Sequence, residues 1–253
     1  ELFPLPMTRS AFVRTPLLSW RGRLRAVLEP LVAASGQDDE SVSDFVVRRL
    51  GREVSQRIFE PLVVGVYGGD PAQLSIRSTL PHLYQAERTR GSLTEALLQL
   101  VEPLKSKGSG KKKESLVALK KGMAELVRRL VKSLPDRVEL RLEAPVSEVT
   151  RREGRFQVQV KGAREAFDTV ILATPASSSA PLVSSAFPEI AEILQGVPYV
   201  SAVIVAFGYD QEVLAGRTGT GFLVPPSEGR TMSACTWGNH KFPGRCPEGH
   251  ALL

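Results

Sequence analysis

Cysteine and histidine are scarce in this sequence. It contains two cysteines, Cys235 and Cys246, and three histidines among 253 residues. Cys235, His240, Cys246 and His250 lie near one another, but two of their spacings exceed the short loops of structural zinc sites. We therefore expect no metal site here. The low cysteine content is typical of a protein in a reducing compartment.

Aromatic residues are also few, at 6% of the sequence, and no basic stretch is interleaved with them. This argues against a platform on which single-stranded nucleic acid stacks, and we expect no nucleic-acid partner. No apolar run approaches the roughly 18 residues that are needed to cross a bilayer. The net charge of +6 and the pI of about 9.5 nevertheless favour acidic partners such as anionic lipid or a carboxylated substrate.

The two ends of the chain do not resemble the ends of a complete protein. The first residue is Glu1 and not methionine, and the last three, Ala251 to Leu253, are apolar. We therefore expect an internal segment of a longer protein. The hydrophobic content of 42% is enough for a sizeable core, in one large domain or in two smaller ones.

The first hundred residues show mainly helical patterns. Ser41 is a favourable N-cap, Asp44 occupies the capping-box position, and Gly51 is placed to end the helix that they begin. Other helices are expected around Trp20–Leu31, over Arg52–Leu62 and from Ser92 onward. The residues expected on the buried faces are Val42, Phe45, Val46, Leu50, Val54, Ile58, Leu62, Leu93, Leu97, Leu100, Val101 and Leu104.

Residues 105–114 contain only glycine, serine, lysine and one glutamate. Such a segment cannot bury a core, so we expect a solvated surface loop. Contact of its lysines, Lys111–Lys113, with anionic lipid is the alternative.

After this loop the pattern changes to one amphipathic helix and several short strands. The helix is expected over Gly122–Leu134, with Met123, Leu126, Val127, Leu130 and Val131 on one side. The expected strands are Val138–Leu142, Val146–Arg151, Phe156–Val160, Phe167–Ala173, Tyr199–Tyr209, Gly221–Val224 and Met232–Trp237. Helices followed by a helix with strands, and then by strands, indicate an α+β fold with at least two subdomains.

Two stretches carry more specific information. Asp168–Thr174 has the pattern of an apolar strand that Pro175 ends, and it fits either a strand that returns the chain to a flavin or an ordinary buried strand. Gly65–Pro71 contains three glycines, which permit either close approach of the backbone to a ligand or a tight turn between helices. This stretch is not a phosphate loop, because no Gly-Lys-Ser/Thr ending follows.

Several segments, taken in order, resemble the protoporphyrinogen oxidases, a family of FAD enzymes in haem biosynthesis. The segments are Ser41–Gly51, Glu60–Pro71, Leu74–Ser78 with Pro81, Gly221–Pro225 with Ser227 and Glu228, and Lys241–Arg245. The family's Gly-x-Gly-x-x-Gly turn and its closing glycine-rich segment are missing, and Lys121 stands where the family has a glycine. The resemblance therefore implies a fragment that is truncated at both ends.

The resemblance also implies an α+β architecture of three parts. Residues 1–114 would form a mainly helical subdomain that binds substrate and membrane. Residues 115–182 would form a partial FAD-binding α/β domain, and residues 183–253 would form the truncated antiparallel sheet of a substrate domain.

The implied activity is FAD-dependent oxidation of protoporphyrinogen IX or coproporphyrinogen III to the porphyrin, with oxygen as the acceptor. The cofactor performs this chemistry, so no catalytic side chain is expected. The resemblance implies that FAD is bound by Val146, Thr174 and Pro175. It implies that the substrate is bound by Gly65, Thr220, Gly221 and Leu223. The arginine that meets a propionate is expected upstream of Glu1.

Other interpretations stay open. Each of these site residues also fits simple packing. The chain also fits another flavin amine-oxidase-superfamily enzyme, such as an amine oxidase or a carotenoid desaturase, or a basic membrane-binding module without enzymatic activity. The resemblance further implies a cytoplasmic location with peripheral attachment to an inner or organelle membrane, and it allows a homodimer. It does not separate the two porphyrinogens.

Overall fold

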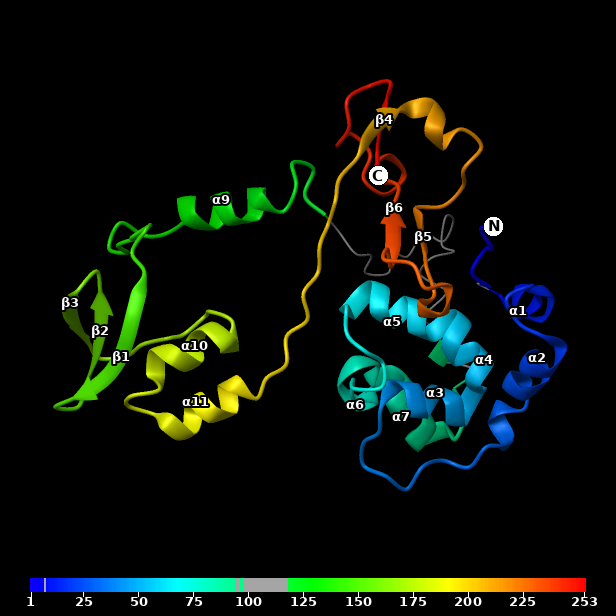
Figure 1. The fold of residues 1–253 in the computed structure, drawn as a ribbon, viewed down its shortest axis with the longest axis horizontal. Helices are drawn as coiled ribbons and strands as arrows, with labels where there is room; N and C mark the ends of the chain where they lie inside the picture. The colour runs from blue at the N-terminus through cyan, green and yellow to red at the C-terminus, as the bar shows by residue number, and fades with distance from the viewer. Residues whose placement is uncertain (7, 94–95, 98–117) are drawn as a thin grey trace. The chain divides into compact units, whose positions relative to one another are not determined.

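The computed structural model describes residues 1–6, 8–93, 96–97 and 118–253. The described chain divides into two compact units, residues 1–126 with 202–253 and residues 127–201. Both helices and strands are present (Figure 1), which confirms a mixed helix-and-sheet fold. The lysine-rich segment 105–114 and most of the helix expected from Ser92 onward lie outside the described residues.

The first unit is a helical body with two small hairpin-like strand pairs. Its helices are α1 (Arg9–Arg14), α2 (Trp20–Val27), η1 (Glu29–Leu31), α3 (Val42–Leu50), α4 (Arg52–Val54), η2 (Ser55–Phe59), α5 (Glu60–Tyr67), α6 (Ile76–Thr79) and α7 (Pro81–Arg90). They enclose one apolar core that contains Leu18, Ala26, Val42, Phe45, Val46, Leu50, Val54, Ile58, Val63, Ile76, Leu83, Ala86, Leu93 and Ala96. None of the helices in the described ranges is both long and apolar enough to cross a bilayer.

Helix α3 forms as its sequence predicts. The Ser41 hydroxyl accepts a hydrogen bond from the Asp44 N–H at 3.0 Å and donates one to the Asp44 carboxylate at 2.8 Å, so the N-terminus is capped. Gly51 ends the helix with a φ of +95°, a conformation that residues with a Cβ rarely adopt. The predicted buried residues Phe45 and Val46 are fully buried.

The next helical segment is longer than the expected Arg52–Leu62. The chain passes from α4 through the π-helical turn η2 into α5 without leaving helical geometry, and α5 continues to Tyr67. Gly65 therefore lies in the last turn of a helix, and the turn between helices that the stretch Gly65–Pro71 permits begins only at Gly68. Gly68, with a φ of +68°, supplies the left-handed cap that stops the helix.

The second part of this unit contains short strand pairs. β4 (Gly208–Asp210) pairs antiparallel with β7 (His250–Leu252), and β5 (Gly221–Leu223) pairs antiparallel with β6 (Ala234–Thr236). The helical turns η4 (Gln211–Leu214), η5 (Pro226–Glu228) and α12 (Gly238–Lys241) join them. The strand expected over Tyr199–Tyr209 is wrong for most of its length, because the residues before Phe207 have no partner strand within the described chain.

The second unit is built on a three-stranded antiparallel sheet. β1 (Val146–Arg152), β2 (Arg155–Val160) and β3 (Ala163–Phe167) pair in sequence order. Both connections have two residues with positive φ, as type I′ hairpins require: Glu153 (+49°) with Gly154 (+81°), and Lys161 (+50°) with Gly162 (+86°). α10 (Ala176–Val183) and α11 (Pro188–Gln195) pack against each other, and their core contains Val149, Val158, Ala180, Val183 and Ala191.

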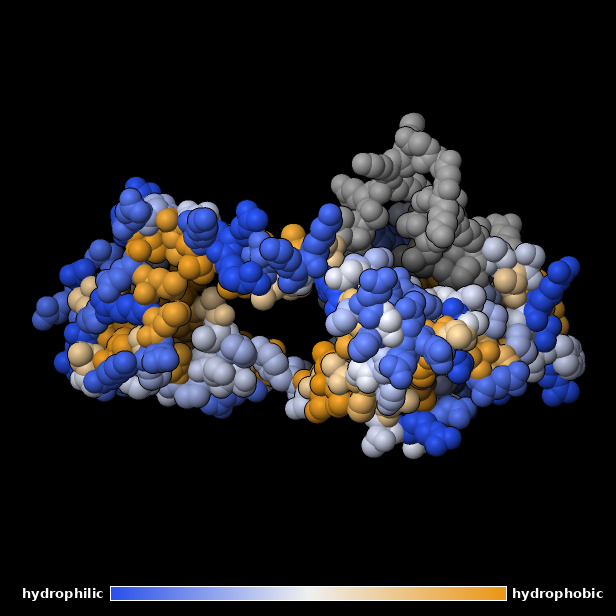
Figure 2. All heavy atoms as spheres, turned by 90° about the horizontal axis from the view of Figure 1, so that it is seen from above, coloured by the Kyte–Doolittle hydropathy of each residue, from blue (hydrophilic) through white to orange (hydrophobic). Residues whose placement is uncertain are grey.

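Two expected strands are absent from the described part of this unit. Val138–Leu142 forms no strand, and Phe167–Ala173 is paired only at Phe167. Both segments have apolar sequence but lack a neighbouring strand that could satisfy their backbone groups. Their side chains are exposed instead, with Leu142 77% and Ile171 87% accessible. Figure 2 shows the resulting hydrophobic surface on this unit, at the left of the view.

Helix α9 (Ala124–Lys132) confirms the amphipathic helix expected over Gly122–Leu134. It has no buried residue, and its apolar side chains are accessible to solvent. The three-part domain division stays a prediction, because compactness alone does not assign binding roles to segments.

Candidate functional site

The structure brings two of the predicted substrate-binding residues together. Gly65 in the last turn of α5 faces Leu223 of β5, so closely that a Cβ on Gly65 would lie 2.6 Å from Leu223 Cδ2. Only a residue without a side chain allows this approach unless Leu223 changes its rotamer. Residues far apart in the sequence, on a helix and on a hairpin, thus form one surface.

The strand alternation in β5 explains why Leu223 reaches the helix. Successive side chains of a strand point to opposite faces. Phe222 packs with Trp237 and Leu214 in a small apolar cluster, so Leu223 and Gly221 face the other way. The hairpin is held by pairing of β5 with β6 and by a 2.9 Å hydrogen bond from the Trp237 N–H to the Thr220 carbonyl.

Gly221 is required by the backbone at this point. Its φ is +147°, and a Cβ there would lie 2.2 Å from the Cys235 carbonyl oxygen of the partner strand. A side chain would therefore strain the backbone and also force the two strands apart. Gly221 and Thr220 contribute to the hairpin geometry, and Leu223 contributes the side chain that contacts α5.

The end of α5 offers a backbone acceptor on this surface. The Gly68 N–H bonds to the Val64 carbonyl at 2.9 Å, and the helix then stops. Within the described chain the next carbonyl, that of Gly65, accepts no hydrogen bond. Carbonyl groups at the C-terminus of a helix carry the negative end of its dipole, so they favour N–H donors.

The side chains beside Gly65 are apolar and accessible. Val66 is 72% exposed and Tyr67 is 49% exposed. The Tyr67 hydroxyl donates to the Thr79 carbonyl at 2.9 Å, which fixes the ring next to the helix end. An exposed apolar surface beside backbone carbonyls that no described group bonds to can bind a flat, apolar ligand that carries N–H donors.

Two cavities of the described chain lie elsewhere. One of about 370 Å³ is lined by Gln211, Glu212, Leu214, Ala215, Asn239 and His240. Another of about 170 Å³ is lined by His82, Gln85, Ala86, Thr89, Arg90 and Ala96. Neither is lined by a predicted site residue, and Gly65 itself is exposed to solvent.

The predicted FAD-binding residues all lie in the second unit. Val146 opens β1 and pairs with Val160, just before a bulge between Val146 and Glu148. Thr174 and Pro175 precede α10, which packs on β1. The Thr174 and Ser179 hydroxyls are 2.6 Å apart and hold the turn into the helix.

These residues fit part of an FAD site. The segment 169–173 has no strand partner in the described chain, and its residues other than Val170, which packs on the core of this unit, are exposed and can lie against a ring system. Nothing in the sequence supplies the Gly-x-Gly-x-x-Gly turn that holds the pyrophosphate at a helix N-terminus.

The described residues contain no cluster of three or more His, Cys, Asp or Glu side chains that could hold a metal ion. His240 instead lies with its Nδ1 3.0 Å from the Gly219 carbonyl, and its ring packs edge-on against Trp237. Cys235 and Cys246 are free thiols.

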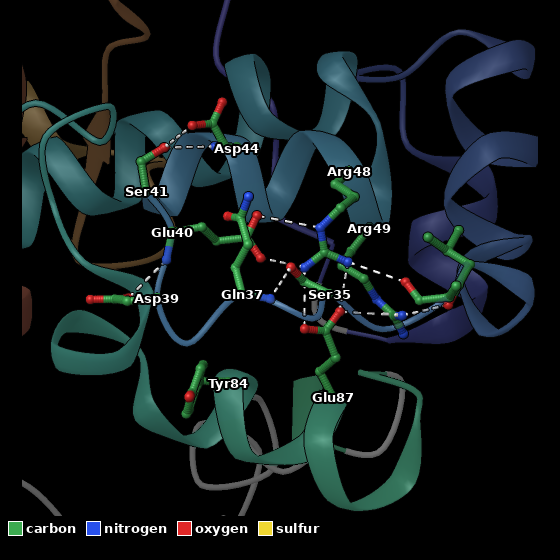
Figure 3. A network of polar contacts seen from close by, with 12 residues as sticks. Ser35, Gln37, Asp39, Glu40, Ser41, Asp44, Arg48, Arg49, Tyr84 and Glu87 are labelled. Carbon is green, nitrogen blue, oxygen red and sulfur yellow. Dashed lines mark hydrogen bonds and ion pairs between the residues drawn. The ribbon is translucent and has the colours of Figure 1, made fainter.

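A network of buried charges in the first unit was not evident from the sequence (Figure 3). Arg49 is fully buried in α3 and pairs with Glu29, and its other amino group lies 3.5 Å from Glu87. Arg48, its neighbour, bonds to Glu87 at 2.7 Å and to Glu40 at 2.5 Å. Burial alone would lower the pKa of Arg48, but the bonds to Glu87 and Glu40 outweigh it and raise this pKa.

The network fixes the segment that leads into α3. Arg49 Nη1 donates to the Val32 carbonyl at 2.6 Å, and Arg88 Nη2 donates to the Gln37 carbonyl at 2.7 Å. The Tyr84 hydroxyl donates to the Asp38 carbonyl, also at 2.7 Å. α3 packs against α4 and η2, which lead into α5. The charge network therefore also stabilises the group of helices on which Gly65 lies. The sequence feature that indicates this network is the pair of adjacent arginines, Arg48 and Arg49, between apolar residues of α3.

Comparison with known proteins places these features in a family. The model of the flavin containing amine oxidoreductases matches residues 1–253. The coproporphyrinogen III oxidase of Bacillus subtilis (strain 168) is 30% identical over 259 residues, which cover 98% of this chain and 53% of that protein. The protoporphyrinogen oxidase of Homo sapiens is 31% identical over 234 residues, which cover 89% of this chain and 48% of that protein.

A solved structure has the same fold. It is the crystal structure of a protein from Exiguobacterium sp. 255-15 that is provisionally named a protoporphyrinogen oxidase. The two structures match with a TM-score of 0.72 at 24% sequence identity, and the match covers 98% of this chain and 52% of that chain. The present chain thus spans about half the length of the relatives that it matches. Because the family model matches all 253 residues, the chain belongs to the flavin containing amine oxidoreductases, and this membership implies FAD as the cofactor.

Proposed function

We propose that a protein containing this chain oxidises protoporphyrinogen IX or coproporphyrinogen III to the porphyrin in haem biosynthesis, with FAD as cofactor and oxygen as acceptor. The relatives named above, a coproporphyrinogen III oxidase and a protoporphyrinogen oxidase, support the substrate class. The contact of Gly65 with Leu223 carries the proposal, because it joins two of the segments that resemble the protoporphyrinogen oxidases into one surface.

The proposed role of Gly65 follows from its backbone. A porphyrinogen is a flexible macrocycle of four pyrroles whose N–H groups point inward. The Gly65 carbonyl at the end of α5, which accepts no hydrogen bond from the described residues, suits these donors, while Val66 and the half-buried Leu223 provide apolar surface for the ring. Thr220 and Gly221 hold Leu223 in position through the hairpin.

Flavin binding is the proposed role of the second unit. The main chain of Val146 would hold the adenine side, and Thr174 with Pro175 would lie beside the flavin ring. FAD bound there would supply the acceptor for a hydride from the substrate, and oxygen would then take up the electrons. The chain's own contribution is to orient the macrocycle and to cover it with apolar surface, which needs no strong general base.

Further parts of the proposal concern location and assembly. Peripheral attachment to a membrane, in the cytoplasm or on an organelle, agrees with the excess of basic residues, 33 Lys and Arg against 27 Asp and Glu. A homodimer is a further part of the proposal. The division into a helical substrate and membrane subdomain, a partial FAD domain and a substrate sheet is also proposed.

The test is a direct assay of the full-length protein with both substrates. Purified protein is mixed in air with protoporphyrinogen IX or coproporphyrinogen III, and porphyrin fluorescence is followed while the flavin content is measured by absorbance. The proposal predicts bound FAD and rapid porphyrin formation from at least one substrate. Protein with bound FAD that oxidises neither substrate above the uncatalysed rate would refute it.

A further inference from the structure

The first turn of α10 receives no cap from its own N-cap residue. That residue is Pro175, whose side chain carries no hydrogen-bond acceptor. The N–H groups of a first helical turn have no carbonyl partner inside the helix, so they need one from outside. Pro181 weakens the helix further, because it lacks the N–H that would bond to the carbonyl four residues earlier. A helix of eight residues with these two prolines depends on tertiary contacts.

Tyr199 supplies the missing acceptor. The Ala176 N–H, the first of the helix, donates a hydrogen bond to the Tyr199 hydroxyl oxygen at 2.8 Å. Tyr199 lies 23 positions farther along the chain, after the end of α11. Its side chain is 58% exposed, so water competes for the bond and the contribution to overall stability is modest. The main effect of the bond is therefore local, at the start of α10.

The same turn is also held from within the helix. The Thr174 and Ser179 hydroxyls lie 2.6 Å apart. The Pro175 carbonyl accepts hydrogen bonds from the Ser178 and Ser179 N–H groups, each at 2.9 Å. Thr174 and Pro175 are thus fixed by Ser179 inside α10 and by Tyr199 from beyond α11.

The residues that lead into this turn give it little support. The segment 169–173 has no strand partner in the described chain, and Ile171 is 87% exposed. A strand with neighbours would fix the position of the residue that follows it, because its backbone is bonded along its length. Here the position of Thr174 and Pro175 depends instead on the contacts at the start of α10.

We propose that Tyr199 is a positioning residue for the flavin. By binding the Ala176 N–H, its hydroxyl fixes the turn of Thr174 and Pro175, beside which the flavin ring is proposed to lie. Residues that contact a cofactor need supporting hydrogen bonds behind them, because a displacement of about 1 Å is enough to weaken the site. The inference rests on the proposed flavin contact of Thr174 and Pro175, and it is independent of which porphyrinogen is oxidised.

The test compares Tyr199→Phe with Tyr84→Phe in the full-length protein. Each substitution removes one phenol hydroxyl and keeps the ring. Tyr84 is the matched control, because its hydroxyl also bonds to a main-chain group, the Asp38 carbonyl at 2.7 Å, but in the first unit. A third variant, Pro175→Ala, tests the flavin contact itself. FAD is removed from each protein, and its dissociation constant is measured by the quenching of flavin fluorescence. Thermal unfolding of each apoprotein checks that it is folded.

We expect Tyr199→Phe to bind FAD about fivefold more weakly than wild type and to shift the visible absorption bands of the bound flavin. Tyr84→Phe should bind FAD as wild type does, although the two variants should unfold at similar temperatures. Pro175→Ala should also weaken FAD binding.

Three results would overturn the proposal. Tyr199→Phe may not match wild type in FAD affinity while Pro175→Ala is weakened, since Tyr199 would then have no part in the flavin contact. Equal weakening in the two tyrosine variants would mean that the loss follows general stability. Unchanged affinity in Pro175→Ala would remove the flavin contact on which the inference rests. The porphyrin assay of wild-type protein decides the oxidation reaction separately.

Discussion

The two units of the chain differ in the size of the apolar core that each one forms. In the described part of the first unit, fourteen buried residues form one core, and charged side chains buried around Arg49 connect its helices. In the described part of the second unit the core has five buried residues, while segments such as Val138–Leu142 expose apolar side chains. The first unit thus has the larger core, although it also exposes apolar side chains such as Leu31 and Ile204, whereas the second unit has a small core beside exposed apolar segments.

This difference follows from how helices and strands are stabilised. A helix satisfies its own backbone hydrogen bonds and needs neighbours only for its apolar face. A strand needs another strand beside it for its backbone groups. The first unit places Gly65 on such a packed body, and the second unit leaves Thr169–Ala173 open. The proposed division of roles, substrate on the first and flavin on the second, agrees with this contrast.

Removing the central charge of the first unit should have the largest effect. Arg49→Met leaves Glu29 and Glu87 without this buried partner, and loss of one member of a buried pair typically costs about 3–5 kcal/mol. Urea unfolding of the full-length protein measures the change. Arg77→Met is the control, because the Arg77–Asp38 pair is exposed and should contribute less than about 1 kcal/mol. Equal effects of the two substitutions would contradict the view that the first unit depends on buried charges.

The hairpin that carries Leu223 gives the next largest expected effect. Gly221→Ala forces a Cβ into a φ of +147° and toward the Cys235 carbonyl, so we expect destabilisation by about 1–3 kcal/mol. Gly208→Ala is a matched change at another strand glycine, where a Cβ would meet no atom within 4 Å. Thermal unfolding compares the two. A Gly221→Ala protein as stable as Gly208→Ala would show that the hairpin is free to adjust.

The contrast between units should also appear in hydrogen exchange. For residues 1–253 expressed alone, amides of β1–β3 should exchange at least about tenfold faster than those of α3, a difference of about 1.4 kcal/mol in opening free energy. The reason is that the sheet has only a small core on one side. Mass spectrometry of peptides from the two regions gives the comparison. Similar protection in both would mean that the second unit is as cooperative as the first.

A smaller, pH-dependent effect is expected at Glu53. Burial raises the pKa of this carboxyl, but hydrogen bonds from the Ser19 hydroxyl and N–H, together with Arg57 and Arg23, outweigh burial and lower it below 4.5. Since the pKa is lower in the folded state, the stabilisation is present above pH 4.5 and is lost as the pH falls through the lowered value. Glu53→Gln should cost up to about 1 kcal/mol at neutral pH. The gap to wild type should narrow in acid, and a gap independent of pH would contradict this explanation.

The sequence predicted most of what depends on local chemistry. Ser41, Asp44 and Gly51 indicated the ends of α3, because helix caps need particular residues. α7 was missed, since it presents only Leu83, Ala86 and Glu87 to the interior and has little apolar periodicity. The strand at Phe167–Ala173 was predicted wrongly, because an apolar pattern does not reveal whether a partner strand is present.

The site was predictable only in part for the same reason. The resemblance pointed to Gly65 and Leu223, but no pattern in either segment indicates that they meet. The ion pair of Arg49 in α3 with Glu29 in η1 joins residues twenty positions apart, and single-sequence patterns do not encode such pairings.

The central claim is that Gly65 belongs to the substrate surface and not to the flavin site. Gly65→Val in the full-length protein tests it, with the porphyrin-forming rate and the FAD content measured on the same sample. Leu223→Ala in the same background makes room for the new side chain against β5 and so separates a blocked surface from a displaced hairpin. We expect the Gly65→Val protein to form porphyrin at least about tenfold more slowly, which corresponds to a loss of about 1.4 kcal/mol of transition-state binding. Its FAD content should be unchanged. The rate should stay low in the double variant. An unchanged rate, or a loss of FAD in proportion to activity, would contradict it.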